Sequence, residues 1–326
     1  MAIQAQGGGA EKVSLTLHQE FIKNHQARIV YMYPDLPFEG SNQENLNIPR
    51  LKIVGIPLGV VRLARISRRF KPDVTLIHCE PAMLLACLTP FLGKLVVVEH
   101  QVYKWRGIKG IVVRFTFRIL KIRRAYTVHL RKSRVLTDRS VYIPNPITIP
   151  ETKVLSTANR LPLELIWIGR LSWQKGFDRL PRILYESKTK VIHIYGSGSL
   201  EGKLNFEGTT CKYYGFRTAV WENLPDNPLL LITSRWEGDG LVILEALIRQ
   251  IPLLIINFPE IDELPIPKSC ICSDETEMTN KILDIQSGLL GVEGLVNHKA
   301  KLIIERSRGP IEISQRYLNF FKRVLE

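Results

Sequence analysis

Two segments of the chain place charged side chains directly after apolar runs. Residues 163–168 are apolar apart from Glu164, the pattern of a strand buried on both faces of a parallel sheet. Arg170 and Lys175 follow this run, at the strand end where ligands of parallel sheets bind. A diphosphate bound there would meet the planar guanidinium of Arg170 and the flexible ammonium group of Lys175. Gly176 is expected to open a helix that packs on the sheet. Taken alone, the two cations are also compatible with a solvated surface loop.

The second segment has two carboxylates around a Gly-x-Gly turn. Gly238 and Gly240 allow the backbone to turn sharply and to approach a ligand closely. The helix expected over 241–249 points its N-terminus at this turn, which favours an anion. Glu245 lies among apolar neighbours, where ribose hydroxyls would supply the partners that a carboxylate needs, unless it is an exposed helix position. Glu237 precedes the turn, within reach of sugar hydroxyls.

The order and spacing of these segments resemble the nucleotide-sugar domain of family 4 (group 1) glycosyltransferases. The matching stretches are Gly-Arg-Leu-Ser-x-Gln-Lys-Gly-Phe-Asp at 169–178, Gly-Ser-Gly-Ser-Leu-Glu at 196–201, Tyr-Gly-Phe at 214–216 and Glu-x7-Glu at 237–245. Ser199 stands where the family has proline. The match covers roughly residues 160–265, and four segments in the same order make it specific.

The resemblance implies the GT-B fold, α/β with two Rossmann-like domains facing a cleft. Members transfer a sugar from a nucleotide donor with retention of configuration, without a cofactor or metal. By resemblance, Arg170 and Lys175 hold the donor diphosphate and act in catalysis, Glu237 binds the donor sugar and acts there too, and Glu245 holds the ribose. Fixed cations and helix dipoles would replace a divalent ion. The other donor-binding positions implied are Gly8, Gly9, Gly169, Gly196, Gly198, Phe216, Gly238, Asp239, Gly240 and Leu241.

The N-terminal half carries two weaker matches. Residues 7–11, Gly-Gly-Gly-Ala-Glu, resemble the family's loop that faces the donor phosphates and the acceptor; a flexible glycine-rich terminus is the alternative. The apolar run 95–98 leads to His100, and in the family a histidine at this strand end lies beside the donor sugar and assists transfer. The residues alone are also compatible with His100 being an ordinary polar residue at the end of a strand.

Besides Ser199, the chain departs from the family pattern in three places. Only six residues precede the glycine run and only Ile3 is strongly apolar, so the first strand is expected to be truncated, with the true start upstream or the chain unstable or inactive. Asp239 stands where the family usually has Phe. Residues 257–263 lack the usual paired glycines. The last two departures leave the choice of donor open.

The net positive charge of the 326 residues lies in the first half of the chain. Residues 1–150 contain 23 Lys and Arg against 9 Asp and Glu, which accounts for the whole net charge of +14. Residues 104–134 hold 11 of these cations, no carboxylate and many interleaved apolar side chains, a composition suited to an anionic membrane surface. A second cluster lies at 62–71. The alternatives are the solvated face of ordinary helices and nucleic-acid binding, but no nucleic-acid motif accompanies the charge.

Length and composition predict two domains of ordinary size. We expect an N-terminal acceptor-side domain over 1–155, a nucleotide-sugar domain over 156–310 and a C-terminal helix over 311–326 that crosses back to the first domain. No signal peptide or transmembrane run is found, and the five cysteines are expected to be reduced.

The sequence therefore predicts a retaining, metal-independent hexosyltransferase that is cytoplasmic and peripheral to the inner face of the membrane. It would use a nucleotide-sugar, a UDP-sugar, and a lipid-linked glycan acceptor such as lipopolysaccharide or surface polysaccharide, and no nucleic acid. The alternatives are a non-catalytic glycosyltransferase-like subunit that binds nucleotide-sugar or membrane, and a GT-B enzyme of another reaction type, an epimerase or phosphorylase.

Overall fold

The computed structural model describes residues 1–4, 9–33, 42–49, 52–78, 80–100, 107–130, 136–148, 164–217 and 219–326. The chain divides into two compact units. Unit 1 comprises Met1–Thr148 and Ser307–Glu326, and unit 2 comprises Ile149–Arg306. The linker expected near 150–161 lies outside the described residues.

Unit 1 is built on a parallel sheet in the order β3-β2-β1-β4-β5-β6-β7. Its strands are β1 Ala2–Gln4, β2 Ile29–Tyr31, β3 Gln43–Asn45, β4 Val74–His78, β5 Lys94–Glu99, β6 Tyr126–His129 and β7 Ser140–Tyr142. The strand expected to be truncated, β1, is as short as β2 and β3. It nevertheless pairs on both sides in the middle of the sheet, with β2 and with β4.

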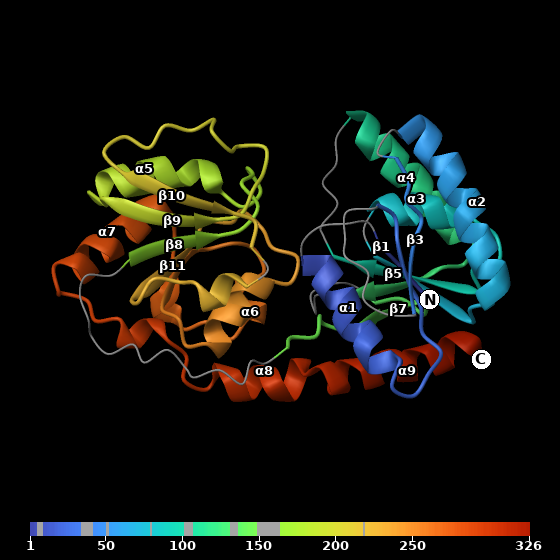
Figure 1. Cartoon of the computed structure of the whole chain (residues 1–326). Helices are drawn as coiled ribbons and strands as arrows, with labels where there is room; N and C mark the ends of the chain where they lie inside the picture. The colour runs from blue at the N-terminus through green and yellow to red at the C-terminus, as the bar shows by residue number, and fades with distance from the viewer. Residues whose placement is uncertain are drawn as a thin grey trace. The chain divides into compact units, whose positions relative to one another are not determined.

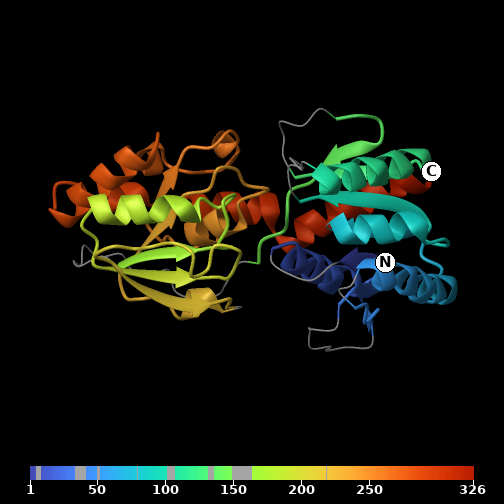
Figure 2. The same cartoon turned by 90° about the horizontal axis from the view of Figure 1, so that it is seen from above.

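Helices cover both faces of this sheet, as a doubly wound topology requires (Figures 1 and 2). They are α1 Gly9–Phe21 and α9 Pro310–Leu325 on one face, and α2 Lys52–Phe70, α3 Glu80–Leu88 and α4 Gly107–Ile122 on the other. Apolar side chains from α2, α3 and the strands form the core of the second face, including Leu63, Ile77, Met83, Leu85 and Val97.

The C-terminal helix α9 is part of unit 1. Its buried Tyr317 lies edge-on to Phe21 of α1, with ring centroids 6.5 Å apart. Phe320 meets Tyr126 of β6 in the same geometry at 6.0 Å. These aromatic contacts attach the last segment of the chain to the first helix.

Unit 2 is a second parallel sheet, in the order β10-β9-β8-β11-β12-β13. The strands are β8 Glu164–Ile168, β9 Val191–Tyr195, β10 Thr210–Gly215, β11 Pro228–Ile232, β12 Leu253–Ile256 and β13 Ile271–Cys272. The helices are α5 Leu180–Glu186, α6 Leu241–Ile248, α7 Glu275–Gln286 and α8 Ala300–Arg308, whose last two residues belong to unit 1. Strands β8, β11 and β12 are the central ones and are almost entirely apolar, as burial on both faces demands.

Within the described parts of the chain, no helix combines the length and the apolar character needed to cross a bilayer. The described cysteines Cys87, Cys211, Cys270 and Cys272 are free thiols.

Candidate functional site

Three loops of unit 2 meet at the carboxyl end of its sheet, and hydrogen bonds hold them together. The Leu171 amide, after β8, donates to the carbonyl of Ser197 after β9 at 3.1 Å. The Arg235 amide, after β11, donates to the carbonyl of Gln174 at 2.9 Å. The adjacent order β9-β8-β11 brings these loops to one edge, where ligands of parallel sheets bind.

Two glycines of these loops are required by backbone contacts between the loops. Gly176 has φ +65°, and a Cβ there would lie 1.8 Å from the carbonyl oxygen of Thr233. Gly196 has φ +141°, and its Cβ would lie 1.8 Å from the carbonyl oxygen of Gly169. No L side chain fits either position without a backbone shift. Gly176 and Gly196 therefore have a structural role, because they allow the loops to approach each other closely.

Lys175 and Glu237 form an ion pair at this edge. Lys175 Nζ lies 2.6 Å from Glu237 Oε2, and the Ser234 hydroxyl donates to Glu237 Oε1 at 2.6 Å. The Glu237 side chain is 10% exposed and that of Lys175 is 24% exposed, so the pair is only partly shielded from solvent. The structure thus joins two of the predicted site residues, which come from different loops 62 residues apart.

Glu245 is a buried carboxylate within α6, not an exposed helix position. The indole Nε1 of Trp221 donates to Glu245 Oε2 at 2.8 Å. Arg249 donates to the Glu245 carbonyl at 2.9 Å, and its guanidinium lies 5.0 Å from the centre of the Trp221 ring. Burial lowers the pKa of Arg249, and the Glu245 carboxylate opposes that shift. The Trp221 bond therefore fixes where this carboxylate points, and Arg249 packs on the Trp221 ring.

The remaining predicted donor residues of unit 2 lie around these two carboxylates along the chain. Arg170 is exposed and has no ion-pair or hydrogen-bond partner for its side chain among the described residues. Gly240 has φ +67° and forms the N-cap of α6, whose first residue is Leu241. Phe216 is 66% exposed after β10. The others are partly exposed or lie in loops: Gly169, Gly198, Gly238 and Asp239.

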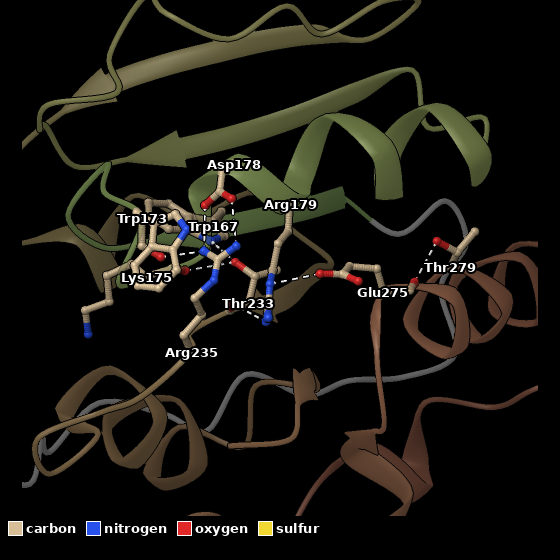
Figure 3. Close-up of polar contacts among 9 residues, drawn as sticks. All are labelled: Trp167, Trp173, Lys175, Asp178, Arg179, Thr233, Arg235, Glu275 and Thr279. Carbon is tan, nitrogen blue, oxygen red and sulfur yellow. Dashed lines mark hydrogen bonds and ion pairs between the residues drawn. The ribbon is translucent and has the colours of Figure 1, made fainter. Parts of the chain in front are cut away.

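A polar network braces the loop that carries Lys175 (Figure 3). Asp178 accepts two hydrogen bonds from the guanidinium of Arg235, both 2.8 Å, and these bonds lower the pKa of the Asp178 carboxyl. Thr233 donates to the Lys175 carbonyl at 3.0 Å and accepts from the buried Trp167 indole at 3.1 Å. Because Arg235 and Thr233 follow β11, they tie its loop to the one after β8.

In unit 1, His100 follows β5 and lies against a second histidine. His78, the last residue of β4, is fully buried, and its Nδ1 is 2.8 Å from His100 Nε2. Burial lowers the pKa of His100 to about 4 and that of His78 well below its usual value. One strand further, His129 Nδ1 is 2.7 Å from Glu99 Oε2. Gly8 lies outside the described residues, and Gly9 is the first residue of α1.

Sequence reasoning missed Ser234, Trp221, Arg249 and His78. Arg249 follows Glu245 by four residues, a helical spacing that could have identified it. Ser234 precedes Glu237 by three residues and carries no distinctive signal. Trp221 and His78 are 24 and 22 residues from their partners, so only the fold brings them there.

Among the described residues, no group of three or more His, Cys, Asp or Glu side chains is arranged to hold a metal ion.

The chain has little sequence similarity to known proteins, but its fold is similar to several solved structures. No family model matches the chain. An uncharacterized 41.2 kDa protein in the cps region of Klebsiella pneumoniae is 28% identical over 108 residues, which are 31% of this chain and 30% of that protein. The similarity thus spans less than a third of the relative's length.

Solved structures match over nearly the whole chain. HepE of Anabaena in complex with UDP has a TM-score of 0.72 at 16% identity, covering 99% of both chains. The lipopolysaccharide outer core galactosyltransferase WaaB has 0.65 at 17% identity, again over 99% of both. Sucrose-phosphate synthase of Thermosynechococcus elongatus has 0.75 at 14% identity, over 99% of this chain and 98% of that one. The chain therefore has the GT-B fold with two Rossmann-like domains, which confirms that expectation.

Proposed function

We propose that this protein is a glycosyltransferase that moves a hexose from a UDP-sugar to a glycan acceptor. The observation that carries the proposal is the meeting of Lys175 and Glu237 at the carboxyl edge of the unit 2 sheet. A cation for the diphosphate and a carboxylate for sugar hydroxyls stand there together, as the family resemblance implies. The GT-B neighbours HepE, solved with UDP and with UDP-glucose, and WaaB support the donor class.

The buried carboxylate of Glu245 supports the ribose contact. Its Oε2 already accepts from Trp221, which holds the group in one orientation. A carboxylate fixed in this way binds a diol with little further loss of side-chain freedom. In our proposal Glu245 binds the ribose hydroxyls, while Arg170 and Lys175 bind the diphosphate.

In the reaction, the bond from the anomeric carbon to the β-phosphate oxygen breaks and a bond to the acceptor oxygen forms. Negative charge builds up on the departing phosphate, and Lys175 and Arg170 stabilise it. The acceptor oxygen attacks from the face that the phosphate leaves, and the phosphate takes its proton. The configuration at the anomeric carbon is thereby retained. The two cations stabilise the phosphate charge in place of a divalent ion. His100 assists the transfer in this proposal, as the family resemblance implies.

We also propose that the acceptor is a lipid-linked glycan and that the protein works at an anionic membrane surface. Helix α4 exposes Ile111, Val112, Phe115 and Ile122, from 41% to 79%. Arg114, Arg118 and Lys121 are exposed beside them, and no carboxylate occurs from His100 to Thr137. Apolar side chains between cations on one helix face suit the headgroup region of such a membrane.

The second basic cluster, at 62–71, contributes less. Arg62 donates to the Asn47 carbonyl at 3.0 Å, and Arg69 pairs with Glu44 at 2.6 Å. Arg68 lies over the ring of Phe91 at 4.9 Å. These side chains are engaged by unit 1 itself, so α4 carries the membrane proposal.

Calorimetry with UDP, GDP and ADP on the wild type, Glu245→Ala and Glu186→Ala tests the proposal. We expect UDP to bind, Glu245→Ala to lose at least ~10-fold in affinity, since a charged hydrogen bond contributes about 1.5–3 kcal/mol, and the exposed helix position Glu186→Ala to behave as wild type. A folded wild type that binds none of the three diphosphates would refute it. UDP binding without sugar transfer to any acceptor would instead favour a non-catalytic subunit.

A further inference from the structure

Two tryptophans, exposed Trp173 and partly buried Trp236, lie close in the chain to Lys175 and Glu237. Trp173 lies two residues before Lys175 and is 57% exposed. Trp236 lies one residue before Glu237, and the two rings meet nearly edge to face, with centroids 5.5 Å apart and planes at 65°. The loops that carry the two charged residues therefore also present two aromatic rings side by side.

The Trp173 ring is held in place although it is exposed. The guanidinium of Arg235 lies 4.3 Å from its centre, and Arg235 also donates to the Trp173 carbonyl at 2.6 Å. Asp178 clamps that guanidinium with two bonds of 2.8 Å (Figure 3). The amide of Gly176 donates to the same Trp173 carbonyl at 3.1 Å. Arg235 covers one face of the ring, and the ring's exposed area is left for a ligand.

A fixed, exposed indole suits a pyranose ring. One face of most pyranoses is lined by C–H groups with partial positive charge, which pack on the electron-rich face of an aromatic ring, while the hydroxyls at the rim stay in water or bind polar groups. Because Arg235 and Asp178 already fix the indole, stacking costs little side-chain entropy. Lys175 and Glu237 follow the two tryptophans in the chain by two residues and one residue.

We infer that Trp173, buttressed by Trp236 and Arg235, is a stacking platform for a pyranose ring. The inference rests on the proposed function, in which Glu245 binds the ribose and Glu237 the donor sugar. Trp173 and Trp236 adjoin Lys175 and Glu237 in the chain, so they belong to the sugar side of the diphosphate and not to the base. The ring comes either from the donor sugar or from the acceptor glycan, which share this chemistry.

The test compares Trp173→Leu with wild type, and uses Tyr185→Leu as a matched control, since Tyr185 is an aromatic side chain 60% exposed on α5. Calorimetry gives the affinity for UDP and for UDP-glucose, UDP-galactose and UDP-N-acetylglucosamine. Saturation-transfer NMR with maltose and lactose, with and without UDP, gives the glycan contact. Thermal melts establish that both variants are folded, and Trp173→Phe, which keeps a ring, is expected to lose less than Trp173→Leu.

We expect Trp173→Leu to bind UDP within ~2-fold of wild type and to lose sugar contact. A loss of roughly 3- to 10-fold in UDP-sugar affinity, the scale of one aromatic contact, identifies the donor sugar. Loss of the disaccharide signals with unchanged UDP-sugar affinity identifies the acceptor. The platform is refuted if the variant weakens UDP and UDP-sugars equally, which marks a nucleotide contact, or if both sugar readouts stay at wild-type level. Absence of UDP binding by the wild type refutes the proposed function instead, and the disaccharide readout still tests the platform.

Discussion

At the scale of single residues, the predicted cation and carboxylate neutralise each other before any donor arrives. Lys175 Nζ is 2.6 Å from Glu237 Oε2, and Ser234 holds the other carboxylate oxygen. A bound diphosphate would compete with Glu237 for Lys175, whereas exposed Arg170 has no such competitor among the described residues. We therefore expect Arg170 to contribute more to first binding and Lys175 more to the charge that develops as the sugar leaves.

Replacement of Lys175 tests its proposed role in stabilising the charge that develops during transfer. We expect Lys175→Ala to lower the rate of sugar transfer by at least ~100-fold, because one fixed donor at the developing charge contributes that much. UDP release during turnover is the measurement, and Lys188→Ala, an exposed lysine after α5, is the control. Near-normal transfer by Lys175→Ala would remove the residue from the reaction.

At the scale of elements, the site depends on how closely the loops after β8, β9 and β11 approach one another. Gly176 lies where a Cβ would overlap the Thr233 carbonyl, and Gly196 lies where it would overlap the Gly169 carbonyl. Side-chain bonds from Arg235 and Thr233 then lock the loops. The apolar strands thus determine the position of the sheet, and the glycines determine how closely the loops at its carboxyl end approach one another.

Gly176 and Gly208 have nearly the same φ, so substitutions at the two positions distinguish the effect of the loop contact on stability from that of backbone strain. Gly176 has φ +65° with an atom 1.8 Å from its hypothetical Cβ, whereas Gly208 has φ +70° with nothing within 4 Å. Gly208→Ala is expected to cost about 1 kcal/mol of stability, the strain of a left-handed residue. Gly176→Ala adds the clash and is expected to cost at least ~2 kcal/mol more. Urea unfolding measures both, and equal losses would show that the loop contact is unimportant.

At the scale of the whole molecule, the histidine pair of unit 1 links stability to pH. The folded pKa of His100 is about 4 and that of His78 is also lowered, whereas unfolded histidines titrate near their ordinary value. As the pH falls from about 6.5 towards 4, the unfolded chain takes up protons that the folded one does not, so the free energy of unfolding decreases.

We expect His100 to account for about 2 kcal/mol of this decrease between pH 7.5 and pH 5. Urea unfolding at the two pH values measures the decrease, and His100→Gln should reduce it. His25→Gln, at an exposed position after α1, should leave it unchanged. An equal decrease in wild type and His100→Gln would show that His100 is not the group responsible.

The charge of the whole molecule is also uneven, since the net excess lies in residues 1–150 and α4 exposes Arg114, Arg118 and Lys121 beside apolar side chains. We expect the protein to float with phosphatidylglycerol vesicles and not with phosphatidylcholine vesicles. Replacing Arg114 and Arg118 with Gln should weaken binding by about 1 kcal/mol for each cation. Phe115→Ser should also weaken it, whereas Leu289→Ser, 81% exposed in unit 2, should not. Equal binding to both vesicle types would contradict an anionic docking surface.

The sequence by itself determined much of the frame of unit 2. The apolar run predicted to be a buried strand contains central strand β8, Glu164–Ile168, and the helix expected over 241–249 is α6, Leu241–Ile248, because apolar spacing and a Gly-x-Gly turn are local properties. The GT-B fold was implied by the family resemblance that the order of the short motifs carries. The short strand β1 was harder to anticipate, because three residues carry little apolar signal and depend on β2 and β4 for their partners.

Only the tertiary structure decided which side chains meet. Lys175 pairs with Glu237, Trp221 with Glu245, His78 with His100, and Trp173 with Arg235 and Trp236. The partners in each of these contacts lie at least 22 residues apart in sequence. Strand order and loop geometry set these contacts, and neither is encoded in the spacing along the chain. The sequence thus named most of the charged residues of the site, and the packing of its loops determined their partners, their burial and the aromatic surface beside them.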